Sequence, residues 1–524
     1  MKLYSAPEMQ LLIDYTGMDM DEGFTDRIAD PMNKALDAME ELEAGGIANP
    51  DEGRMVGHYW LRAPQMAPNA EIRSEIEDCA KDIDEFVKDV HTGEIRPSEG
   101  SYKHVLVCGI GGSSLGPEFV SKALASKEDK MDLFFLDNTD PIGMDRIYQQ
   151  VEDELGQTLT VVISKSGGTV ETRNAMLETQ AFYKRNGVDF ASHAVCISGV
   201  GSKLWKTAEN EGWLRLFPMW DWVGGRTSVM SAVGLVPLGL QGIDTKALLL
   251  GAAQADQWGR SREFKSNPAA IMAACWYKCT GGKGGTANVI LPYRDSLVML
   301  PKYLQQLVME SLGKEYDLDG NRVCQGLAVM GNKGSSDQHS YVQQLVGGPD
   351  NIFVTFIQTL KDRDGESIDV DANGSGTTSG DYLNAFMLGT AKALKAHGKA
   401  SMTFTVPDVS AVSIGRLIAL FERTVGIYAK LININAYHQP AVEAGKKAAA
   451  GLIELQHRIL AVLEENKNGS AAPGPENGLR ADAIAEKLSA DPDDVFRLLL
   501  HLTAADRVTM HPADDLMQSK FTIG

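Results

Sequence analysis

The stretch VVISKSGGTVET, residues 161–172, joins an apolar run to the start of a helical pattern. Its first three residues are β-branched and the run ends abruptly at Ser164, which is typical of a buried strand in a parallel sheet. Serines, two glycines and Thr169 follow. Hydroxyl and main-chain donors at a helix N-terminus form a cradle for an anion, most often phosphate. An ordinary strand-to-helix turn with a Ser or Thr cap gives the same pattern, so this stretch alone leaves both interpretations open.

A second glycine-rich turn of the same kind precedes this stretch. The run HVLVCGI, residues 104–110, predicts a strand, and GIGGSSLGP, residues 109–117, connects it to a helix. Further strands are predicted at residues 131–138, 158–164 and 193–198. Alternating strands and helices indicate a doubly wound parallel sheet, in which ligands bind at the carboxyl ends of the strands. Both turns lie at such ends, which favours the phosphate-binding interpretation.

The rest of the chain extends this pattern to a two-domain α/β fold. Apolar residues three and four apart predict helices before residue 95, and strands are predicted again near residues 287, 351 and 402. We therefore predict two doubly wound parallel-sheet domains with an N-terminal helical layer and a small C-terminal helical, winged-helix-like extension. The predicted limits are 1–95 for the helical layer, 96–240 and 241–430 for the α/β domains, 431–465 for a C-terminal helical segment, 466–478 for a linker and 479–524 for the extension.

The composition argues against several classes of partner. The formal net charge is −20, which disfavours binding to nucleic acid or to an anionic membrane surface. The N-terminal sequence MKLYSAPEMQ has no apolar signal segment, and no later run approaches the roughly 18 apolar residues of a membrane span. We therefore expect a cytoplasmic protein without nucleic-acid or membrane partners.

The patterns of common metal and nucleotide sites are incomplete. The six cysteines are scattered, so we expect them to be buried and reduced, and without an HExxH motif we predict no metal site. In the first turn Ser114 replaces the third glycine of GxGxxG, although Asp137 ends the second strand, where a ribose-binding acid would lie. A nucleotide-dependent α/β enzyme therefore remains an alternative, whereas the P-loop pattern does not occur.

Two segments offer candidate catalytic residues. WVGGRTS, residues 222–228, places Arg226 after two glycines at a predicted helix start, where a structural salt bridge is the alternative to a ligand contact. KYLQQLVMESLGKE, residues 302–315, predicts one helix with Gln306 and Glu310 on the same face. A solvated polar stripe has the same spacing, but apolar neighbours crowd this one. A carboxylate in such surroundings can act as a base near neutrality.

Two later polar segments are ambiguous by themselves. GSSDQHSYVQQ, residues 334–344, places His339 after a turn, where a structural hydrogen bond is the commoner role. NINAYHQPAVEAGKK, residues 433–447, contains Gln439 and runs into a helix that carries Lys446. An exposed helix with a Glu–Lys pair would show the same pattern.

Taken together and in this order, six segments resemble the motifs of the phosphoglucose isomerase family. They are GIGGSSLGP, SKSGGTVET, GGRTS, QQLVMES, DQH and HQPAVEAGK, spread over residues 105–450. The resemblance implies two sugar-isomerase α/β domains and a homodimer with shared active sites. It also implies interconversion of glucose 6-phosphate and fructose 6-phosphate, in glycolysis and gluconeogenesis, without metal or cofactor. The substrate-binding residues that it implies are Gly112, Ser113, Ser164, Lys165, Ser166, Thr169, Gly225, Gln306 and Gln439.

The chemistry of aldose–ketose isomerisation assigns roles to the remaining residues. The sugar ring opens, a proton moves between C2 and C1, and the ring closes. We expect Glu310 to shuttle this proton and Arg226 to stabilise the negative charge on the enediolate oxygens. His339 and Lys446 are expected to move protons at O5 and O1, while Gln306 orients the sugar. The family resemblance implies that His339 acts from the partner subunit.

The tail suggests an alternative function. NKNGSAAPGPENG, residues 466–478, has the composition of a flexible linker, and a helix–turn–helix pattern follows it. A sugar-phosphate-binding regulator that binds DNA would have such a tail. However, residues 476–524 carry five Lys or Arg against nine Asp or Glu, and DNA binding needs the opposite balance. We therefore expect the tail to have a packing or assembly role.

Overall fold

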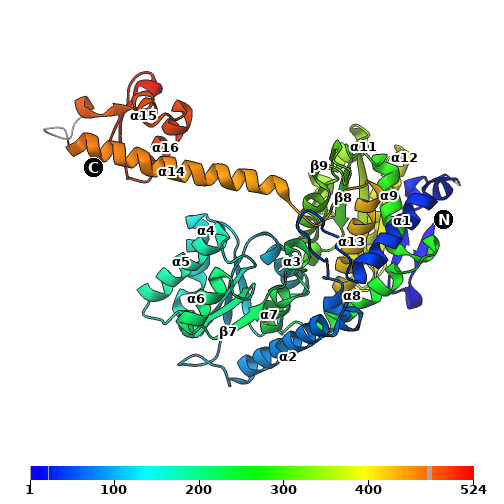
Figure 1. Ribbon diagram of the computed structural model, residues 1–524. Coiled ribbons are helices and arrows are strands. Elements are labelled where there is room, and N and C mark those ends of the chain that lie inside the picture. The colour runs from blue at the N-terminus through cyan, green and yellow to red at the C-terminus, as the bar shows by residue number, and fades with distance from the viewer. Residues whose placement is uncertain (1, 22, 469–474, 524) are drawn as a thin grey trace. The chain divides into compact units, whose positions relative to one another are not determined.

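The computed structural model describes residues 2–21, 23–468 and 475–523, and the chain divides into two compact units, residues 1–438 and 439–524 (Figure 1). Much of the predicted linker therefore lies outside the described residues, and the domain limits given above stay predictions. No helix in the described ranges is both long enough and apolar enough to span a membrane.

A five-stranded parallel sheet forms the first half of the larger unit. Its order is β4–β3–β5–β6–β7, so the connections change direction between the adjacent strands β3 and β5. The strands are β3 (His104–Cys108), β4 (Asp132–Leu136), β5 (Thr158–Ser164), β6 (Ala194–Ser198) and β7 (Arg215–Pro218). Four of these strands confirm the prediction, whereas β7 was not predicted.

Helices cover both faces of this sheet, as a doubly wound fold requires (Figure 1). One face packs against α4 (Pro141–Val151), α5 (Val170–Arg185) and α6 (Lys203–Glu211), and the other against α2 (Ala70–Thr92) and α7 (Ala232–Gln241). In β5, Val161 and Ile163 face the α2–α7 side and Val162 faces the opposite side. Side chains alternate along a strand, so a sheet covered on both faces needs a continuous apolar run.

A six-stranded mixed sheet forms the second half, in the order β1–β2–β13–β12–β8–β11. Its four parallel strands have the spatial order β11–β8–β12–β13, which is second, first, third and fourth along the chain. The strands β4–β3–β5–β6 of the other sheet have the same order. At the edge of the parallel part, β2 pairs antiparallel with β13. The strands are β1 (Leu3–Ser5), β2 (Leu12–Asp14), β8 (Ala287–Pro292), β11 (Ala328–Gly331), β12 (Ile352–Thr359) and β13 (Ser401–Val406). The three strands predicted in this region are confirmed, but the β1–β2 hairpin before the N-terminal helices was not predicted.

Helices also cover both faces of the second sheet. The helices on one face are α11 (Val342–Gly347) and α12 (Ser379–Ala396), and those on the other are α1 (Phe24–Glu43), α8 (Thr245–Gly259), α9 (Pro268–Thr280) and α13 (Ala411–Leu431). Helix α13 is buried along most of its length and carries Arg423, whose Nε lies 3.0 Å from the Asp256 carboxylate on α8. This ion pair leaves neither buried charge uncompensated.

The single helix predicted over residues 302–315 is wrong in two respects. Helix α10 (Leu300–Leu304) passes into a π-helical turn, η11 (Gln305–Glu310), and the helix ends at Leu312. The chain then enters β9 (Lys314–Tyr316), which pairs with β10 (Arg322–Gln325). Gly313 permits this tight exit, because a Cβ there would lie 2.8 Å from the Met309 carbonyl oxygen.

The cysteines depart from the expectation at two positions. Cys324 is exposed and Cys279 is half-buried, while the other four are buried. Cys324 lies on β10 of the two-stranded β9–β10 sheet. In the part of the chain that the structure describes, no group of three or more His, Cys, Asp or Glu side chains is arranged to hold a metal ion.

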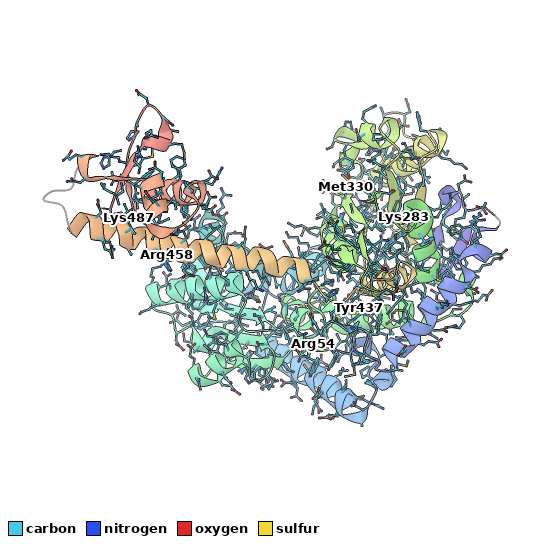
Figure 2. All side chains as sticks on the ribbon, turned by 45° about the horizontal axis from the view of Figure 1, so that its top comes forward. Arg54, Lys283, Met330, Tyr437, Arg458 and Lys487 are labelled. Carbon is cyan, nitrogen blue, oxygen red and sulfur yellow. The ribbon has the colours of Figure 1, made fainter. Side chains whose placement is uncertain are left out.

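The C-terminal unit has the element order of a winged helix. Its sheet order is β14–β16–β15. The elements are α14 (Pro440–Asn468), β14 (Leu479–Arg480), α15 (Ala481–Leu488), α16 (Pro492–Ala504), β15 (Thr509–His511) and β16 (Lys520–Thr522). Leu455, Ile459 and Leu463 of α14 belong to its apolar core. Arg458 on α14 also donates to the Leu488 carbonyl at 2.6 Å (Figure 2).

Candidate active site

The two glycine-rich turns lie where ligands of doubly wound sheets bind. They follow β3 and β5, the adjacent strands at which the connections change direction. The first turn contains η5 (Gly111–Ser113), and thus Gly112 and Ser113, and leads into α3 (Leu115–Leu124). The second turn leads directly into α5, with Thr169 at the helix boundary.

Hydroxyl groups gather at the N-terminus of α5. Ser164 Oγ donates to Thr169 Oγ1 at 3.2 Å, and Ser166 Oγ accepts from the Gly168 amide at 3.2 Å. The Thr169 side chain does not cap the helix, so the first amides of α5 are suited to binding an anion. Arg173 and Lys203, which sequence reasoning missed, line the small cavity beside this turn.

The first turn packs directly against the turn that carries Arg226. A Cβ on Gly112 would lie 1.9 Å from the carbonyl oxygen of Gly225, in η8 (Gly225–Thr227). Ser228 Oγ donates to the Gly225 carbonyl at 2.7 Å and to the Gly112 carbonyl at 3.3 Å. Two motifs that are distant in sequence therefore form one surface.

Lys165 links the second turn to the same region. Its Nζ donates to the carbonyls of Asp221 at 2.8 Å and Val223 at 2.9 Å. Burial lowers the pKa of Lys165 to about 8, and the nearby Asp221 carboxylate partly opposes this effect. The Lys165 ammonium thus faces the segment before Arg226.

Arg226 and Glu310 form an ion pair at the centre of the site. Arg226 Nε lies 3.2 Å from Glu310 Oε2, and Nη1 donates to Ser311 Oγ at 3.3 Å and to the Ala436 carbonyl at 3.0 Å. Arg226 is buried, and burial lowers its pKa while Glu310 and Glu52 raise it. An arginine still keeps its charge in such surroundings.

Gln306 lies on the same wall as Glu310, one helical turn earlier. Its Nε2 would be 3.1 Å from a Cβ on Gly111, so the amide faces the first turn. Its Oε1 is buried and has no hydrogen-bond partner among the described residues. A buried acceptor without a partner suits a ligand hydroxyl, and π-helical turns such as η11 are frequent at functional sites.

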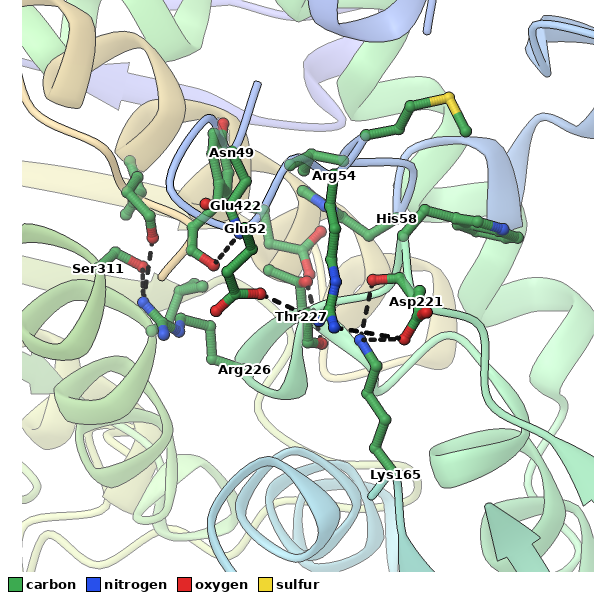
Figure 3. Close-up of a pocket in the computed structure, with 18 residues that line it drawn as sticks. Asn49, Glu52, Arg54, His58, Lys165, Asp221, Arg226, Thr227, Ser311 and Glu422 are labelled. Atoms are coloured by element: carbon green, nitrogen blue, oxygen red, sulfur yellow. Dashed lines mark hydrogen bonds and ion pairs between the residues drawn. The ribbon is translucent and has the colours of Figure 1, made fainter. Parts of the chain in front are cut away.

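A further wall comes from the N-terminal segment, in which sequence reasoning found no chemistry. Asn49, Glu52, Arg54 and His58 line the same pocket as Lys165 and Arg226 (Figure 3). Arg54 Nη1 lies 3.0 Å from Glu52 Oε2, and Arg54 Nη2 lies 3.8 Å from Asp221 Oδ1. The available signal was the charged segment DEGR, residues 51–54, which three residues separate from the buried aromatic run HYW, residues 58–60.

The remaining predicted site residues are His339, Gln439 and Lys446. His339 is exposed at the end of η12 (Ser336–His339), outside the residues that line the Arg226 pocket. Gln439 and Lys446 belong to the C-terminal unit, at the start of α14. The larger unit therefore assembles the glycine turns, Arg226, Gln306 and Glu310.

The phosphoglucose isomerase family model matches residues 27–471. The chain belongs to the phosphoglucose isomerase family. The family match includes every predicted site residue and also the pocket wall at residues 49–58. The winged-helix elements after residue 471 lie beyond it.

Individual members of the phosphoglucose isomerase family are similar over nearly the whole chain. The glucose-6-phosphate isomerase of Desulfitobacterium hafniense strain Y51 is 51% identical over 525 residues, covering 100% of this chain and 97% of that protein. The enzyme of the same name from Geobacter sp. strain M21 is 52% identical and covers 96% of this chain and 93% of its own. A crystal structure of a glucose-6-phosphate isomerase from Chlamydia trachomatis superposes with a TM-score of 0.77 at 26% identity, covering 87% of this chain and 90% of that one.

Proposed function

We propose that this protein is a glucose-6-phosphate isomerase that reversibly converts glucose 6-phosphate into fructose 6-phosphate. The observation that carries the proposal is the Arg226–Glu310 pair at 3.2 Å, beside the glycine-rich turns of a phosphoglucose isomerase family member. Glu310 moves the proton between C2 and C1, and such a base contributes about 10²–10⁴-fold to the rate. Arg226 stabilises the enediolate oxygens, an effect on the order of 10²–10³-fold for one donor.

The remaining residues of the larger unit bind and orient the substrate. The phosphate binds at the N-terminus of α5, with Ser113, Ser164, Lys165, Ser166 and Thr169 around it. Gly112 and Gly225 let the main chain approach the sugar, and Gln306 orients it through the amide that faces Gly111. The net reaction moves protons within one molecule, so its chemistry requires no redox cofactor.

The active sites are shared between the two subunits of a cytoplasmic homodimer that serves glycolysis and gluconeogenesis. The exposure of His339 supports this arrangement, because an exposed side chain on a short turn can reach a neighbouring subunit. His339 of each chain then moves protons at O5 in the partner's site. Lys446 and Gln439, at the start of α14, act at O1 and on the sugar.

The DNA-binding alternative has no comparable support. The first turn of α16 carries Asp493 and Asp494, and Arg497 of this helix is paired with Asp493 at 2.8 Å. A helix that starts with two carboxylates repels the phosphate backbone. The test of the isomerase proposal is to incubate the purified protein with glucose 6-phosphate, with and without a chelator, and to measure fructose 6-phosphate. We expect it to form in both samples, and its absence in both would overturn the proposal.

A further inference from the structure

A buried lysine that takes no part in the steps above holds the end of the helix that carries Glu310. Lys314 is the first residue of β9, and its Nζ donates to the Glu310 carbonyl at 2.8 Å and to the Ser311 carbonyl at 2.7 Å. Lys314 is only 5% exposed. The last carbonyls of a helix have no amide partner within the helix, so Lys314 satisfies two acceptors in a place that is nearly closed to water.

A charged donor is a costly choice for this task. Among the described residues, no carboxylate lies within ion-pair distance of Lys314. The pKa of Lys314 is lowered to about 7, chiefly by burial and also by Arg226, while Glu310 and Asp51 oppose the shift. A neutral donor could satisfy the two carbonyls without the cost of burying a cation. The choice of lysine therefore suggests that a second positive charge near Glu310 and Arg226, present below about pH 7, has a use.

We propose that Lys314 is a positioning residue for the isomerase site, one that fixes the main chain of Glu310 and Ser311 and adds positive charge behind them. Arg226 contacts the side chains of these two residues, and Lys314 contacts their carbonyls. A shift of the helix end would therefore change both sets of contacts together. The inference rests on the proposed role of Glu310 as the base.

Lys314→Gln and Lys314→Met in the full-length chain separate the two contributions. Glutamine keeps a donor without the charge, and methionine removes both. We expect kcat to fall about tenfold in the first variant and about 100-fold in the second, with KM within about threefold, since the loss concerns the chemical step. The matched control is Lys302→Met, which changes an exposed lysine on α10 and should leave kcat unchanged.

The pH profile provides a readout that a merely structural role would not move. The charged and titratable groups around Lys314 are Arg226, Glu310, Asp51 and His438. Removing one cation favours protonation of a carboxylic base, so the acidic limb of kcat/KM should move to higher pH in both variants and stay in place in Lys302→Met.

Two outcomes would overturn the positioning role. One is a kcat of Lys314→Met equal to that of the wild type. The other is a lower melting temperature of the Lys314 variants with no change in the pH profile of kcat/KM. Glu310→Gln, assayed in parallel, separates the role of Lys314 from the proposed function. An active Glu310→Gln variant would refute the role of Glu310 as the base. An inactive Glu310→Gln variant together with fully active Lys314 variants would refute only the positioning role of Lys314. If Lys314→Met does not fold, Lys314→Gln decides through the same measurements.

Discussion

Gly112 and Gly225 are in main-chain contact, so close that a Cβ on Gly112 would lie 1.9 Å from the Gly225 carbonyl oxygen. This contact joins the first glycine-rich turn to the turn that carries Arg226. The obstructing atoms belong to the main chain, which cannot rotate away as a flexible side chain can. The position of Arg226 therefore depends on the absence of a side chain at residue 112.

Gly112→Ala should separate the two turns. We expect the free energy of unfolding to fall by about 1–3 kcal/mol, as overpacking typically does. We also expect kcat/KM to fall at least about tenfold, because small displacements of catalytic groups are costly. Gly389→Ala on α12 is the matched control, since nothing lies within 4 Å of its Cβ position and alanine favours a helix. Equal activity and stability of the two variants would contradict the importance of the contact.

The lowered pKa of Lys165 predicts that kcat/KM depends on pH. Burial lowers its pKa to about 8, below that of a free lysine, so the ammonium loses its proton as the pH rises through this value. The pH profile of kcat/KM reports the free enzyme, and kcat/KM should fall above about pH 8 as the phosphate loses a cation. Lys165→Arg stays charged, so its profile should lack this alkaline limb. The same limb in both enzymes would assign it to another group.

Sequence patterns predicted the elements that depend on local composition. The apolar run before Ser164 marked β5 because both faces of the sheet are covered, and the two glycine-rich turns were placed correctly at the ends of strands. Gln306 and Glu310 were expected on one wall, and both lie in η11. Each of these features depends on neighbours within a few residues.

Features that depend on distant contacts could not be predicted in this way. The Gly112–Gly225 contact and the wall with Glu52 and Arg54 join segments that only the packed fold brings together. The β1–β2 hairpin has strands of three residues each, too short for a periodic signal. The π-helical turn lies between α10 and the helix end at Leu312, and helical periodicity does not distinguish it from an α-helix.

The shared active site predicts complementation between two inactive chains. Glu310→Gln and His339→Ala chains with different tags are co-expressed, and the mixed dimer is purified. If His339 acts in the partner's site, one site carries both defects and the other carries none. The mixed dimer should then recover about half of the wild-type activity, because one of two symmetric sites is intact. A mixed dimer of two differently tagged Glu310→Gln chains is the control, and recovery no greater than in that control would refute a site shared through His339.

The part of the chain after residue 468 should be dispensable for chemistry but not for the solubility of α14. A chain that ends after residue 468 loses the partners of Leu455, Ile459 and Leu463, so we expect an active enzyme that aggregates. Ile459→Lys should restore solubility to the shortened chain, yet it should destabilise the full-length protein, in which Ile459 is fully buried. Light scattering and the isomerase assay measure both effects. A shortened chain that is soluble and dimeric but inactive would show that the tail contributes to the site.

Proton transfer by Glu310 is tested most directly by Glu310→Gln in deuterated water. The substitution keeps the size and hydrogen bonding of the side chain but removes the base. We predict a fall in kcat of at least about 10²-fold with little change in KM, and loss of the deuterium that the wild-type enzyme introduces at the carbon receiving the proton. Glu315→Gln, which alters an exposed carboxylate paired with Arg322 at 2.9 Å, should match the wild type. Near-normal turnover with deuterium incorporation by Glu310→Gln would contradict the role of Glu310 as the base.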